Sequence, residues 1–226
     1  MKRDSGGPSD AELTAMAKTQ PWRTRGRAGA PLDLQQMKAA VDQWATGHPG
    51  EDRAAAQQIL HEALDKEFDS TVKSYNISMN ARRLTDLPTD VLNQLAKCFE
   101  LSVGNNRLTK LELKNPHIQR LLARNNRISE LEIKSADELE YLDLANNMLV
   151  LDHDNTACLA GLGPGCEVQV CDNKLTSGDI DAHNAQYQGQ GASLVAARPR
   201  QDDQDLKRLD NDVLETRLLQ KNPDEW

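Results

Sequence analysis

The sequence predicts an α/β solenoid, a ladder of about five short repeats with a helical cap before it and a C-terminal helix after it. Two observations carry this expectation: one short apolar motif recurs at near-regular intervals, and two amphipathic segments precede its first copy. The composition agrees, because 38% of residues are hydrophobic but only 4% are aromatic. We therefore expect a core rich in Leu, Val and Ala.

The first segment, residues 1–31, is polar and carries six basic residues against three acidic ones. Such a composition cannot bury enough apolar surface to order itself, so we expect disorder. It contains no apolar run of the kind found in a secretory signal peptide. A secretion or targeting segment is one interpretation, and an ordinary disordered terminus is the other.

Residues 32–70 are predicted to form a helical N-terminal cap, with helices over 32–46 and 50–66. The intervening stretch 46–50 combines Gly and Pro and indicates a turn. In each segment, one apolar face recurs at helical spacing. The residues on these faces are Met37, Val41 and Trp44, then Ala55, Ile59 and Ala63.

Residues 75–195 contain the motif Leu-x-Leu-x-x-Asn-x-Leu in five copies. The Asn position is occupied by Arg82, Asn106, Asn126, Asn147 and Asn173, in steps of 24, 20, 21 and 26 residues. Leucine-rich repeats have periods of 20–29 residues. The alternating apolar residues are expected to face the core of a short strand. The four asparagines are expected to turn inward and satisfy backbone groups, as structural residues of the repeat.

Parallel strands stacked in this way would line a concave face, and the side chains between the buried ones would point outward. Arg and Tyr are enriched among the residues that anchor protein interfaces. The expected partner-binding residues are Arg120, Leu122, Arg124, Tyr141, Asp143, Ser102 and Gln169. The charge is also divided, with a net +5 over 75–127 and −8 over 128–176. Such polarity would orient a complementary partner, although mixed charge on a solvated surface is the alternative.

Several classes of function are disfavoured. A net charge of −8 argues against binding nucleic acid through its phosphates, and no apolar stretch is long enough to span a membrane. Four cysteines without zinc spacing, scattered histidines and the lack of phosphate-loop or HExxH motifs predict no metal, no cofactor and no catalytic residue. The acidic run Asp152-His153-Asp154 is expected in a solvated loop.

The order of these features resembles a known family. Trp44, the turn at 49–53, the first repeat ending Leu84-Thr-Asp-Leu87-Pro88 and the closing segment 165–177 with Tyr187-Gln-Gly189 follow one another as in the invasion-plasmid-antigen-H type effectors of type III secretion. The similarity covers residues 40–195 and concerns the substrate-recognition half of these E3 ubiquitin ligases. It implies that residues 1–31 are the secretion signal, served by a secretion chaperone. It also implies that the concave face binds a host protein in the host cytoplasm.

The chain departs from that family in its catalytic part. The family carries a large helical domain with a Cys-x-Asp motif, whereas here 31 residues follow Val195 and no cysteine is followed two places later by Asp. The resemblance therefore implies a non-catalytic binding module, as in the Yersinia outer-protein M type. The alternatives are a truncated or degenerate ligase, and a repeat scaffold of the bacterial cytoplasm.

The last segment, residues 196–226, is acidic and is predicted to contain an amphipathic helix. Its apolar stripe comprises Leu206, Leu209, Val213, Leu214 and Leu218. We expect this helix to cap the last repeat. The alternative is a remnant of a full effector, since residues 212–218 are similar to the extreme C-terminus of the ligase family.

Overall fold

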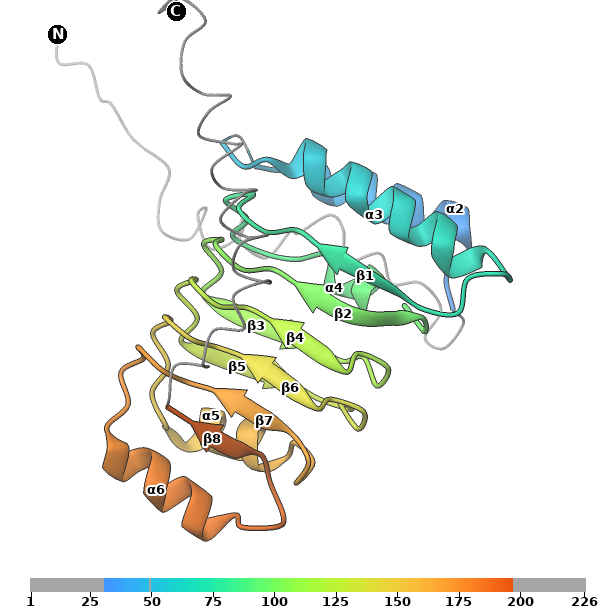
Figure 1. The fold of residues 1–226 in the computed structure, drawn as a ribbon. Helices are drawn as coiled ribbons and strands as arrows, with labels where there is room; N and C mark the ends of the chain where they lie inside the picture. The colour runs from blue at the N-terminus through green and yellow to red at the C-terminus, as the bar shows by residue number, and fades with distance from the viewer. Residues whose placement is uncertain (1–30, 49, 197–226) are drawn as a thin grey trace, which may run out of the picture.

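The computed structural model describes residues 31–48 and 50–196 (Figure 1). The expectations for residues 1–31 and 196–226 fall outside this part of the chain, except at Pro31 and Ala196. The N-terminal helices are α2 (Leu34–Ala45) and α3 (Arg53–Phe68), close to the predicted bounds. They pack on each other, and α3 also packs on the first strand.

Helix α2 begins at a capping box. The Asp33 carboxylate accepts from the Gln36 backbone N–H at 2.8 Å, and the Gln36 side chain accepts from the Asp33 N–H at 3.1 Å. The predicted apolar face of α2 is buried. In α3 Ala63 is buried as predicted, whereas Ala55 and Ile59 are half-buried and their neighbours Ala56 and Leu60 are fully buried instead.

The centre of the fold is a parallel sheet in which each strand pairs side by side with the strand of the preceding copy (Figure 1). Its strands, in spatial order, are β1 (Tyr75–Ser78), β2 (Cys98–Ser102), β4 (Arg120–Leu122), β6 (Tyr141–Asp143), β7 (Glu167–Gln169) and β8 (Ser193–Val195). One apolar residue of each strand lies in a single buried row: Ile77, Leu101, Leu121, Leu142, Val168 and Leu194. The result is an α/β repeat fold, with one copy of the motif in each of the first five strands.

Shorter elements occupy the connections. Strands β3 (Lys110–Leu113) and β5 (Glu130–Ile133) form a second, two-stranded parallel sheet. The helices are α4 (Thr89–Leu92), α5 (His153–Ala160) and α6 (Ser177–Gln186). In Figure 1, α2 and α3 lie beyond β1 at one end of the sheet, and α6 lies beyond β8 at the other.

The acidic run at 152–154 is not a loop, which corrects the sequence-based expectation. His153 and Asp154 open α5, and the Asp152 side chain caps it by accepting from the Asn155 N–H at 2.8 Å. The Asn155 side chain is buried and bonds to the backbone of Ser129, Val150 and Leu131. This run is therefore used to start a helix.

The four asparagines of the motif turn inward and connect successive copies. Each donates its Nδ2 to two carbonyls of its own copy and one of the preceding copy, at 2.8–3.3 Å. Each Oδ1 accepts from a backbone N–H of the preceding copy at 2.9–3.1 Å. The asparagines are Asn106, Asn126 and Asn147, which are buried, and Asn173, which is half-buried. They replace the ladder hydrogen bonds that end with each strand.

A second asparagine row lies one residue earlier. Asn105, Asn125 and Asn146 have positive φ values of 56°, 57° and 54°, a conformation that Asn tolerates better than most residues. The Asn125 Nδ2 donates to the Asn105 Oδ1 at 2.8 Å, and the Asn146 Nδ2 donates to the Asn125 Oδ1 at 2.9 Å. Consecutive Asn-Asn pairs in the sequence were a signal for this tight turn that periodicity alone did not reveal.

A buried arginine joins the helical cap to the first copy. Arg53 donates to the Glu51 and Asp86 carboxylates and to the Trp44 carbonyl, each at 2.7 Å, and its guanidinium lies 4.5 Å from the Trp44 ring centroid. The Trp44 indole also donates to Asp86 at 2.6 Å. Burial raises the pKa of Glu51, but hydrogen bonds from Thr85 and Arg53 outweigh it and leave this pKa below its ordinary value.

The open edge of the sheet at β8 is covered by a single side chain. Asn184 of α6 accepts from the Leu194 N–H at 2.8 Å and donates to the Leu194 carbonyl at 2.9 Å. These are the backbone groups of β8 that point away from β7. The amide therefore takes the place of a further strand and prevents edge-to-edge pairing.

Candidate functional site

The side chains of the main sheet that point away from the core form the strand face. They lie in two rows that follow the strand register. The first row is Asn76, Glu100, Arg120, Tyr141, Glu167 and Ser193, and the second is Ser78, Ser102, Leu122, Asp143, Gln169 and Val195. All but one of the residues predicted to bind a partner belong to these rows, and Arg124 follows directly after β4.

Arg120 is held at the centre of the first row. Its Nε donates to the Glu100 carboxylate on one side at 3.0 Å, and its guanidinium lies 5.1 Å from the Tyr141 ring centroid on the other. Arg120 is exposed and Tyr141 is half-buried. Burial, aided by the carboxylates of Asp143 and Glu167, raises the pKa of Tyr141 to about 12, so its hydroxyl stays protonated at neutral pH. This row presents a positioned cation beside an aromatic ring.

The second row is largely covered, contrary to the sequence-based expectation of exposure. Ser102, Asp143 and Gln169 are only 8%, 7% and 4% exposed. Neighbouring strands are about 4.8 Å apart, so longer side chains of adjacent copies cover shorter ones between them. Leu122 and Arg124 remain half-buried. The strand face thus presents Arg120 and Tyr141 at its surface, beside a layer of largely covered polar side chains. We call this layer the polar floor; it consists of Ser102, Asp143 and Gln169 with the adjoining Arg124.

The floor carries polar atoms that are incompletely paired. The Asp143 carboxylate accepts from the Ala145 N–H at 2.9 Å, and burial raises the pKa of Asp143 even though that bond and Arg124 oppose the shift. The Gln169 Nε2 donates to Glu167 at 2.8 Å, whereas its buried Oε1 has no protein partner among the described residues. The Arg124 Nε is likewise buried without an acceptor there. Such groups are costly unless water or a partner satisfies them.

The cysteines have the properties of packed side chains. Burial raises the pKa of the Cys98 and Cys166 thiols to about 12, and it also raises that of Cys158. The thiolate is the nucleophilic form, so these thiols are unreactive at neutral pH. Cys171 is buried as well. Within residues 31–48 and 50–196, no group of three His, Cys, Asp or Glu residues is arranged to hold a metal ion, and no helix is long and apolar enough to cross a membrane.

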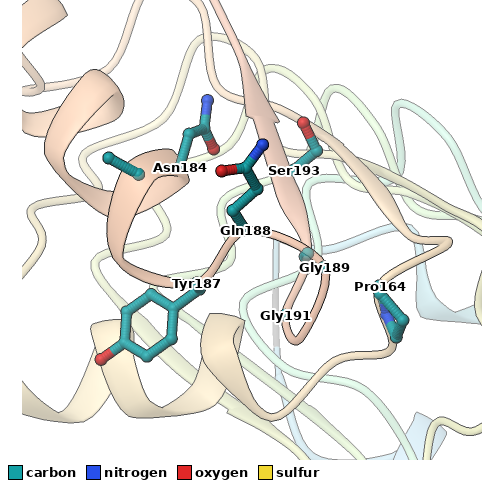
Figure 2. A pocket seen from close by; sticks show the side chains of 9 residues that line it. Pro164, Asn184, Tyr187, Gln188, Gly189, Gly191 and Ser193 are labelled. Atoms are coloured by element: carbon teal, nitrogen blue, oxygen red, sulfur yellow. The ribbon is translucent and has the colours of Figure 1, made fainter.

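A hollow of about 400 Å³ lies away from the predicted site, beside the segment that follows α6 (Figure 2). Its lining includes Pro164, Asn184, Gln188 and Ser193. The Tyr187 ring extends away from Asn184 and Gln188 in Figure 2. No carboxylate, thiol or imidazole lines the hollow, so its described walls offer the Ser193 hydroxyl and the Tyr187 phenol without a general base beside them.

No family model matches this chain, and no curated protein is significantly similar to it in sequence. Among solved structures, the chain is similar to one described as a Shigella effector LRR domain. The sequence identity is 20% and the TM-score is 0.37, and the alignment covers 70% of this chain and 95% of that chain.

Proposed function

We propose that this chain is a non-catalytic leucine-rich-repeat module that binds another protein through the strand face. The observation that carries the proposal is the arrangement around Arg120, which a carboxylate and an aromatic ring hold from both sides. A side chain already ordered in the free protein loses little conformational freedom on binding. Arg and Tyr are both enriched among the residues that anchor protein interfaces.

The polar floor supports the same proposal. The buried Oε1 of Gln169 and Nε of Arg124 have no protein partners among the described residues. A partner that supplies a donor to one and an acceptor to the other would recover hydrogen bonds that the free chain lacks. Recognition of this kind discriminates strongly between partners, because a mismatched surface leaves the same groups unpaired.

Two matched variants test binding: they remove the same kinds of side chain from different surfaces of the protein. The variant R120A/R124A/Y141A removes two cations and an aromatic residue from the strand face. The control K66A/F68A/K73A removes the same types from exposed positions at the cap end. We expect the control to capture the same proteins as the parent chain and the strand-face variant to lose them, with unchanged melting temperature. Retained capture by the strand-face variant would refute the site.

We propose further that the chain is a secreted bacterial effector and that its partner is a host protein in the host cytoplasm. The basic, polar segment 1–31 and the order of cap, repeats and closing segment support this proposal. Residues 1–31 fused to a reporter should be exported by a type III apparatus, with help from a secretion chaperone. A fusion that stays in the bacterium would favour an internal repeat scaffold.

The non-catalytic part has its own test. We expect no ubiquitin thioester and no ubiquitin chains when the protein is incubated with ubiquitin, ATP, E1 and a panel of E2 enzymes. The protonated state of Cys98, Cys158 and Cys166 supports this expectation. A thioester on any cysteine would instead establish a degenerate ligase.

A further inference from the structure

A second surface runs along the turns at the carboxyl ends of the strands, the edge toward which the arrows of Figure 1 point. It consists of the residue that follows the Asn position in each copy. These residues are Arg83, Arg107, Arg127, Met148 and Lys174, and all five are exposed. Each of the last four donates its backbone N–H to the preceding copy, at 2.8, 2.9, 2.9 and 3.1 Å. We call this stack of five side chains the turn ridge.

The cations of the turn ridge have no counter-charge among residues 31–48 and 50–196. Across the described residues, none of its four cationic side chains forms an ion pair or a side-chain hydrogen bond. The contrast is the β3–β5 sheet, where Lys110, Lys114 and Lys134 are all paired with glutamates. Adjacent copies are about 4.8 Å apart at the strands, so the ridge concentrates positive charge that no described residue neutralises.

The fourth copy interrupts the charge with an apolar spot. Met148 is 43% exposed, and Val150, two residues further, is 38% exposed. The position of Val150 is occupied by Thr or Ser in the other copies, at Thr85, Thr109, Ser129 and Thr176. Both exposed positions of this copy are therefore apolar, directly beside the arginines. A ligand that fits the ridge needs carboxylates and one large apolar side chain.

We propose that the turn ridge binds an extended acidic segment of a partner protein. Its carboxylates meet Arg107 and Arg127, whose planar guanidinium groups suit bidentate binding of carboxylates. Its apolar side chain packs on Met148 and Val150. A polypeptide fits better than a nucleic acid, because a phosphate backbone has no apolar side chain to pack on the exposed Met148 and Val150.

The proposal is independent of the strand face, since no turn-ridge residue belongs to either row. The test is fluorescence anisotropy of a labelled peptide, Glu-Asp-Glu-Asp-Leu-Glu-Asp-Glu, titrated with the full chain. The variant R107E/R127E removes the central cations. The control K66E/K73E makes the same change in net charge at exposed, unpaired lysines of the cap end of the described fold.

We expect the parent and the control to bind and R107E/R127E to bind at least about tenfold more weakly, because hydrogen bonds between charged groups are lost. The peptide with Ser in place of Leu should bind several-fold more weakly to all three proteins. A parent chain that does not bind, or an equal loss in the control, overturns the proposal. Melting curves of both variants verify that they are folded.

Two further experiments identify which ligand the turn ridge binds. The chain's own segment Asp202-Asp-Gln-Asp-Leu206 has the same chemistry, so the full-length variant D202N/D203N/D205N is tested with the same peptide. Unchanged binding supports an external partner, whereas binding that appears only in this variant assigns the ridge to the chain's own tail and overturns the proposal. Displacement of the peptide by single-stranded DNA at lower concentration than by unlabelled peptide would overturn it in favour of nucleic acid.

Discussion

Replacing Asn106 or Asn126 by Ala tests how the motif asparagines stabilise the fold. The two substitutions remove the same atoms but leave different backbone groups unpaired. The carbonyls bound by Asn126 all have a second donor: Asn106 for Val103, Asn147 for Ala123 and the Asn105 N–H for Arg124. Loss of Asn126 therefore orphans one group, the buried N–H of Leu108.

Fewer of the backbone groups that Asn106 binds have a second hydrogen-bond partner. Its Oδ1 accepts from two N–H groups, those of Arg82 and Leu84, and its Nδ2 donates to the Met79 carbonyl, which no other donor among the described residues reaches. Loss of Asn106 therefore orphans two buried groups, the Leu84 N–H and the Met79 carbonyl, and the partly buried Arg82 N–H. Each buried unsatisfied group costs about 1–3 kcal/mol. At the lower end of this range, N106A loses at least about 2 kcal/mol and N126A about 1 kcal/mol.

The free energy of unfolding from urea titrations followed by circular dichroism measures this difference. Asn76→Ala, at an exposed position of β1, is the control and should change stability by less than about 0.5 kcal/mol. An N126A loss equal to or greater than that of N106A would refute the reasoning, because the shared donors would then contribute nothing.

The remaining predictions concern the cap, the sheet edge, the polar floor and the thiols. Arg53→Met should lower the free energy of unfolding by about 3 kcal/mol in the same titration, because it removes the buried cation that pairs with Glu51 and Asp86 and takes this donor from the Trp44 carbonyl. Asn184→Ala should expose the backbone of Leu194 and produce self-association, visible by sedimentation velocity; a strictly monomeric variant would contradict edge capping. Asp143→Asn should stabilise the protein at neutral pH. Its pKa is raised in the folded state, so the carboxylate lowers stability as pH rises above the ordinary aspartate pKa, and the variant should lose that slope. Native Cys98 should react with iodoacetamide far more slowly than the unfolded chain at pH 8, since its pKa is about 12.

The periodic part of the molecule was accessible from the sequence because each copy repeats the same local physics. An apolar residue at every second position must be buried in a strand, and the register row from Ile77 to Val168 follows directly. The inward direction of Asn126 and its equivalents follows from the need to pair backbone groups where the strand ends. The position of a residue within the motif was enough to predict both the buried row and the inward asparagines.

The parts that were missed depend on what neighbouring copies do to each other. Asp143 and Gln169 occupy positions that point away from the core, yet both are buried, and spacing within one copy carries no information about burial by neighbouring copies. The connections differ in length between copies, so α5 follows no pattern shared by all copies. The β3–β5 pair repeats an apolar alternation that only two copies contain, Leu111-Glu-Leu113 and Leu131-Glu-Ile133. Asp152 was a clear capping residue, but only a visible apolar run after it would have predicted the helix.

The two proposed surfaces meet at the same turns. In the third copy, Arg124 belongs to the strand face and Arg127 to the turn ridge. The buried structural residue Asn126 lies between them in the sequence. The Asn126 amide bonds the backbone of the residues around it and fixes the directions in which both arginines leave the turn. A partner that wraps from the strand face over the edge of the sheet could engage both. Because the buried amide supports each surface, loss of binding in an asparagine variant would not distinguish them, whereas separate exchange of Arg124 and of Arg127 distinguishes the two sites.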